Sequence, residues 1–172
     1  MTYAQGRTIH DADSHLLELP DFLQRYGDPA VRDQLPDIGF AADTGPKLKF
    51  VLDRIIEAGG HSEEHRDELR ALGDAILSGP KGFKALGAFD GGERGEVIDM
   101  LGFESQLLFA TFSAVVVFDA VDAEWAYAGA RAHNRGVAEF CACDSRLVGV
   151  ACVPMHDVCL LYTSDAADEL SC

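Results

Sequence analysis

Three short, mostly apolar segments that alternate with helical patterns most constrain the fold of this chain. We predict strands over about 7–13, 106–112 and 146–153. Helical spacing of apolar residues predicts helices over about 96–101 and 120–141, the second with Trp125, Ala128, Ala132 and Val137 as its buried stripe. Strands that alternate with helices in this way are typical of a parallel sheet, so we expect an α/β fold.

A long insertion, about residues 19–90, separates the first strand from the first of these helices. We expect a helical turn near Pro20 and an irregular stretch over 26–40, which is rich in Pro and Gly. The polar part that follows contains His61 and His65, one helical turn apart. This spacing is found in metal sites, but the charged surroundings favour a plain surface helix.

The first strand ends in a pair of side chains with metal-binding chemistry. Asp13 and His15 are two residues apart, so an extended backbone projects both side chains from the same face. A carboxylate and an imidazole are good ligands for Zn, Mn or Fe. We therefore take Asp13 and His15 as candidate metal ligands, although two ligands alone do not make a site.

Composition argues against several classes of partner. The net charge is −15 over 172 residues. Binding to nucleic acid or to an anionic membrane surface needs clustered Lys and Arg, so this charge argues against both partners. There is no apolar run long enough to span a bilayer and no signal-peptide pattern, so a cytoplasmic location is the expectation. Cys141, Cys143 and Cys152 lack the spacing of a disulfide framework or a zinc knuckle, and we expect free thiols.

The end of the chain differs in composition from the rest. Residues 159–172 resemble the translation of a sequencing-library adapter, and we exclude them from the expected fold as a segment foreign to the protein. The alternative is the start of an ordinary helix capped by Ser164. The domain expected from sequence is therefore 1–158, followed by a non-native tail.

Several stretches that together cover most of residues 7–157 carry a resemblance to a known family. They are Ile9–Glu18 with Pro20 and Asp21, Gly87–Asp90 with Glu93 and Arg94, Asp99–Thr111, Ala132–Arg135, Glu139–Cys141, Arg146–Leu147 and Val153–Asp157. In their order and spacing, they resemble the N-terminal part of a metal-dependent enzyme of the amidohydrolase-related family, which includes decarboxylases of the aminocarboxymuconate-semialdehyde type.

The resemblance implies a partial (β/α)8 (TIM) barrel of about three strands with its site at the carboxyl ends of the strands. It implies that Asp13 and His15 are first-strand ligands of a divalent metal, Zn or Mn, with Asp where the commoner family pattern has His. Glu18 would lie near the site and Asn134 on a helix near the barrel, while His156 is more consistent with a loop residue than with a site residue.

The activity implied is hydrolysis or non-oxidative decarboxylation of a small-molecule substrate, a cyclic or aromatic acid or amide. The catalytic residues of the family lie beyond the part that this chain resembles, so we expect the truncated chain to be inactive. The resemblance also allows a homodimeric parent. An alternative from another class is a non-enzymatic interaction module that binds through its acidic surface and the segment of His61 and His65.

Overall fold

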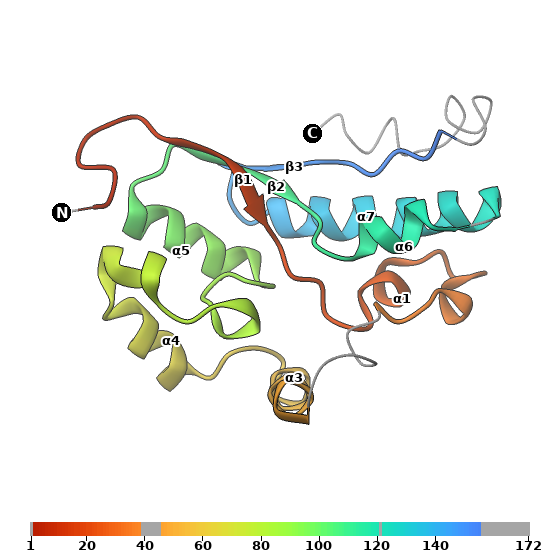
Figure 1. Ribbon diagram of the computed structural model, residues 1–172, viewed down its shortest axis with the longest axis horizontal. Helices are drawn as coiled ribbons and strands as arrows, with labels where there is room; N and C mark the ends of the chain where they lie inside the picture. Colours follow the sequence, from red (N-terminus) through yellow and green to blue (C-terminus); the bar gives the residue numbers. More distant parts are fainter. Residues whose placement is uncertain (1, 39–45, 121, 156–172) are drawn as a thin grey trace.

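The sheet has three parallel strands in the order β1-β2-β3 (Figure 1). The computed structural model describes residues 2–38, 46–120 and 122–155. The strands are β1 (His10–His15), β2 (Ser105–Phe109) and β3 (Leu147–Gly149). The predicted mixed α/β fold with a parallel sheet is thus confirmed. The predicted strands are in the right order, but their bounds differ. β1 starts three residues later and ends two residues later than expected, so it includes both candidate ligands. β2 and β3 end three and four residues earlier than expected.

Helices α5 (Gly91–Leu101) and α7 (Ala123–Cys141) lie on the same side of the sheet (Figure 1). α5 begins five residues before the predicted start because the Asp90 side chain caps it by accepting from the Glu93 N–H. It ends where predicted, at Gly102, whose φ of 75° suits glycine.

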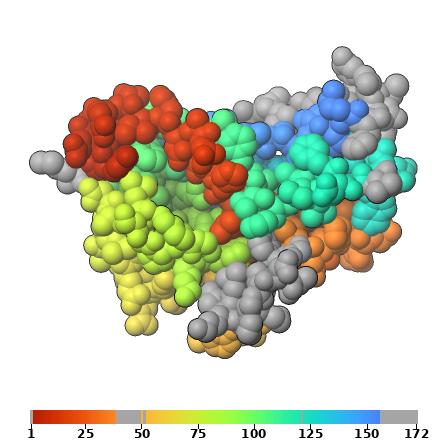
Figure 2. Space-filling view, viewed as in Figure 1, coloured from red at the N-terminus to blue at the C-terminus, as the bar shows by residue number. Residues whose placement is uncertain are grey.

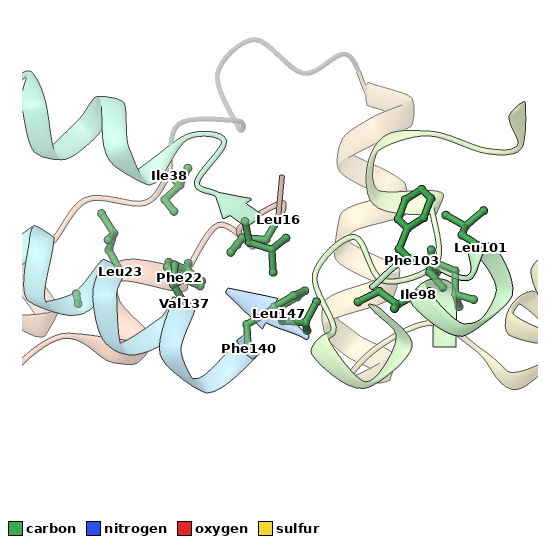
Figure 3. Packing of buried hydrophobic residues seen from close by; sticks show 14 of the residues in the cluster. Leu16, Phe22, Leu23, Ile38, Ile98, Leu101, Phe103, Val137, Phe140 and Leu147 are labelled. Carbon is green, nitrogen blue, oxygen red and sulfur yellow. The ribbon is translucent and has the colours of Figure 1, made fainter. Parts of the chain in front are cut away.

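The core lies between these helices, the sheet and the segment after β1 (Figure 3). The predicted stripe of α7 is confirmed for Ala128, Ala132 and Val137, which are all buried. It is wrong for Trp125, which is 38% exposed in the first turn of the helix. Gly136 lets the insertion pack closely on α7, since a Cβ there would lie 2.3 Å from the Phe22 ring.

The described part of the insertion forms short helices. Its elements are α1 (Phe22–Tyr26), η1 (Arg32–Gln34), α3 (Pro46–Ala58), α4 (Glu63–Arg70), η2 (Gly73–Ser78) and η3 (Gly82–Lys84). The later part of the insertion lies beside the N-terminal segment, as yellow and green beside red in Figure 2. One backbone hydrogen bond joins them directly, from the Leu17 N–H to the Ala88 carbonyl at 2.7 Å.

The two faces of the sheet differ in cover. One face packs on α7, because a Cβ added at Gly149 would lie 2.4 Å from the Val137 side chain. Val148 points to the other face and is 50% exposed. Since Val148 pairs with Leu107 in the register, Leu107 shares this less covered face.

A further helix, α6 (Ser113–Phe118), follows β2. None of the described helices is both long and apolar enough to cross a bilayer.

Candidate functional site

Asp13 and His15 lie at the carboxyl end of β1, on the sheet face away from α7. His15 pairs with Phe109 in the register, two residues along β2 from Leu107. Between Asp11 and Ser14 the register shifts, so that three steps along β1 match two along β2. This extra residue is a β-bulge, a feature that re-aims side chains. The Asp13 side chain is 95% exposed and that of His15 is 47% exposed.

The orientation of the His15 ring leaves one nitrogen open. Its Nδ1 lies 3.2 Å from the carbonyl oxygen of Ala110. Because a carbonyl only accepts, the contact favours the tautomer in which Nδ1 carries the proton. The lone pair is then on Nε2, which is 3.7 Å from Asp13 Oδ1. Metal-binding histidines typically donate their other N–H to a carbonyl or carboxylate in this way.

The separation of these two atoms fits a shared ion. Two donors at about 2.1 Å from a tetrahedral ion are about 3.4 Å apart, close to the distance between Asp13 Oδ1 and His15 Nε2. A typical centre needs at least one more protein ligand. The described part of the chain has no cluster of three or more His, Cys, Asp or Glu residues that could hold an ion. The residues present therefore fit two positions of a coordination sphere.

Glu18 is not part of this pair but anchors the loop after β2. Its carboxylate, in a residue only 1% exposed, accepts from the backbone N–H groups of Thr111, Phe112 and Ser113. It also accepts from the Ser113 hydroxyl at 2.6 Å. Thr111 Oγ1 in turn donates to the Leu16 carbonyl at 2.6 Å. Glu18 thus fixes the chain just past β1 to the chain just past β2.

His133 extends this buried network from α7. Its Nδ1 lies 2.6 Å from Ser113 Oγ. Since the Ser113 hydroxyl donates its proton to Glu18, it can only accept from His133, so Nδ1 carries a proton. Burial lowers the pKa of His133, and Ser113 is fully buried. No pattern in the sequence links Glu18, Ser113 and His133, which are 95 and 20 residues apart along the chain.

Asn134 is buried and holds the segment after β3. It lies on α7, and its amide makes two hydrogen bonds to the backbone of Cys152, one to the carbonyl and one from the N–H. This contact holds the segment after β3 against the helix. His156 and the tail 159–172 lie outside the described residues.

The predicted surface helix is present as α4 and contains His65, but it does not include His61. Helix α4 starts at Glu63 with Ser62 as its N-cap, so His61 precedes it. His61 is buried, with Nδ1 2.9 Å from Glu93 Oε2 and Nε2 2.7 Å from the Phe83 carbonyl. His65 Nε2 lies 2.9 Å from the Lys84 carbonyl. The prediction is wrong for His61 because its ring is hydrogen-bonded to Glu93, a buried partner from α5.

Both ring nitrogens of His61 face acceptors, so only the protonated ring satisfies both contacts. Burial works against this charge, but the hydrogen bonds to Glu93 and to the Phe83 carbonyl outweigh it and raise the pKa of His61. The same pairing, together with the Gly87 N–H, outweighs burial at Glu93 and lowers the pKa of that carboxyl. This cluster is fully engaged inside the protein.

The three described cysteines are free, as expected. Burial raises the pKa of Cys141 and of Cys152 to about 11, so neither thiol is a reactive nucleophile near neutral pH. Cys143 is exposed.

In the comparisons with known proteins, no family model matches the chain and no curated protein matches it.

Proposed function

We propose that this chain contributes the first-strand ligands, Asp13 and His15, to the divalent-metal centre of an amidohydrolase-type hydrolase or decarboxylase. The observation that supports this most is the pair itself: His15 Nε2 is open, His15 Nδ1 is held by a carbonyl, and Asp13 Oδ1 is 3.7 Å away. A barrel completed by further strands would enclose the sheet face that carries the pair.

The chemistry follows from what the chain's own residues do. Asp13 and His15 would hold the ion at the carboxyl end of β1, and the Ala110 carbonyl keeps the His15 ring in its ligating tautomer. When bound, the metal polarises a substrate oxygen or lowers the pKa of a bound water. Leu107, which lies on the same sheet face, offers apolar surface that suits a cyclic or aromatic substrate.

The test is a zinc titration of the 172-residue chain. We expect binding that is weak for a metalloprotein, since two protein ligands hold an ion less tightly than three or four. Asp13→Asn and His15→Gln should each abolish it. His10→Gln is the matched control, because His10 is also exposed on β1, but its Nδ1 contacts the Ser105 hydroxyl. A hydroxyl can donate or accept, so it does not fix the ring in the tautomer that leaves Nε2 open. Zinc binding that survives Asp13→Asn and His15→Gln would contradict the proposal.

Turnover is not expected of this chain. Hydrolase or decarboxylase activity should appear only when a longer gene product supplies the remaining ligands and an acid–base group. Asp13→Asn and His15→Gln should abolish that activity. If such a product were fully active while containing no metal, the proposed chemistry would be wrong.

A further inference from the structure

Arg94 is a buried cation that holds the end of β1. It lies in the first turn of α5 and is 8% exposed. Its Nε donates to the Gly87 carbonyl at 2.6 Å. Its Nη1 donates to Ser14 Oγ at 2.7 Å and its Nη2 to the His15 carbonyl at 2.8 Å. Two of the three hydrogen bonds therefore fix consecutive residues of β1, one of them a candidate metal ligand.

Stability alone does not explain this arginine. Among the described residues, no carboxylate lies within ion-pair distance of Arg94, so its charge is buried with neutral partners. Burial lowers the pKa of Arg94 to about 10, against the opposing influence of Asp11. An apolar side chain in this place would avoid that desolvation. What the guanidinium provides is a rigid set of directed donors.

The backbone that Arg94 holds is the bulged part of β1. Asp11 pairs with Gln106, and Ser14 pairs with Leu108, so Ala12 and Asp13 both lie opposite Leu107. In a regular strand, Asp11 would share a face with Asp13. The bulge instead lets Asp11 contact Gln106 Nε2, at 3.1 Å, and accept from the Asp13 N–H, also at 3.1 Å.

We propose that Arg94 is a positioning residue for the metal pair: its hydrogen bonds to Ser14 Oγ and the His15 carbonyl hold the bulge that places Asp13 Oδ1 and His15 Nε2 within reach of one ion. This inference rests on the proposed function. It adds to it a residue that touches neither ion nor substrate and acts through the backbone of β1.

The test compares Arg94→Lys with Arg146→Lys. Lysine keeps the charge but loses the fork of donors, so Arg94→Lys should weaken zinc binding about 10- to 100-fold. Arg146 is the matched control because it also binds α5, through Asp99, but from the segment just before β3. Its variant should bind zinc within about twofold of the parent, an effect as small as expected of a partly exposed ion pair.

A second measurement needs no metal. In the metal-free chain, ¹⁵N NMR of the His15 ring should show one dominant tautomer, protonated at Nδ1, and Arg94→Lys should produce a mixture. If Arg94→Lys fails to fold, Ser14→Ala replaces it. Ser14→Ala removes one of the two hydrogen bonds from Arg94 to β1, so zinc binding should weaken about threefold to tenfold. The His15 ring should again show a mixture of tautomers instead of one.

The outcomes separate the two proposals. If Arg94→Lys, or Ser14→Ala in its place, leaves zinc affinity and the His15 tautomer unchanged while Asp13→Asn abolishes binding, the inference about Arg94 is overturned and the metal pair stands. If Asp13→Asn leaves zinc binding unchanged, the metal pair itself is wrong. The tautomer then decides alone whether Arg94 positions His15.

Discussion

Two histidine–carboxylate pairs in this chain have the same chemistry and opposite surroundings. His61 and Glu93 are 2.9 Å apart, with side chains only 3% and 2% exposed, and each has further partners in the core. His15 and Asp13 are 3.7 Å apart, with side chains 47% and 95% exposed, and His15 Nε2 faces Asp13 across a gap suited to an ion. The contrast indicates that a pair with every donor and acceptor satisfied stabilises the fold, while a pair held in place with open donor atoms is a candidate for binding.

The largest effect that tests this comparison is the loss of Glu93. Glu93→Gln removes the negative charge beside a buried, protonated His61, so we expect the free energy of unfolding to fall by about 3 kcal/mol. Urea denaturation followed by circular dichroism measures it. The matched control is Glu96→Gln on the same helix. Glu96 pairs with Arg70, which is partly exposed, so the loss of the Glu96 charge should cost about 0–1 kcal/mol. Equal effects would mean that Glu93 is not a structural partner.

The second effect concerns Glu18, which joins the chain after β1 to the chain after β2. Glu18→Gln weakens hydrogen bonds from three backbone N–H groups, so we expect a loss of about 2 kcal/mol in the free energy of unfolding. Glu104→Gln, an exposed carboxylate just before β2, is the control and should change stability by less than about 0.5 kcal/mol. A silent Glu18→Gln would mean that this carboxylate does not anchor the loop.

The third prediction is a dependence of stability on pH that comes from His61. Its pKa is raised in the folded protein, so its contribution is fully present below the unfolded value of about 6.5 and is lost as the pH rises through the folded value. Glu93 has the opposite pH dependence. Because its pKa is lowered in the folded protein, its contribution to stability is present above the unfolded pKa and is lost as the pH falls through the folded pKa. Thermal unfolding of the parent from about pH 6 to 9 should show a falling midpoint that His61→Gln flattens. An unchanged slope in the variant would contradict it.

The smallest expected effect on stability is at the exposed pair. Asp13→Asn should change the free energy of unfolding by less than about 0.5 kcal/mol, because the side chain is almost fully solvated. Denaturation of the variant beside the parent measures this directly. A loss as large as that of Glu93→Gln would show that Asp13 serves the fold, and the contrast between the two pairs would disappear.

Local patterns in the sequence predict what local chemistry decides. The parallel order of strands, the helix that ends at Gly102 and the buried face of α7 at Ala132 and Val137 follow from periodicity and from glycine. The spacing of Asp13 and His15 predicts that they share a face, and their side chains do lie close together.

What sequence cannot predict depends on partners far along the chain. His61 is buried by Glu93, 32 residues away, and the end of β1 is held by Arg94, 80 residues from Ser14. The bulge that separates Asp11 from Asp13 likewise depends on pairing with β2. A single sequence gives no sign of such contacts. For that reason the charged surroundings predict the surface helix that contains His65 but not the burial of His61.

The most direct measurement of the central claim is ¹⁵N NMR of the His15 ring as zinc is added to the intact chain. We predict a proton on Nδ1 and a bare Nε2 before zinc, then a shift of the Nε2 resonance on binding that is absent in Asp13→Asn. Zinc that shifts other histidines while the His15 Nε2 resonance stays in place, or a His15 shift that is unchanged in Asp13→Asn, would contradict it.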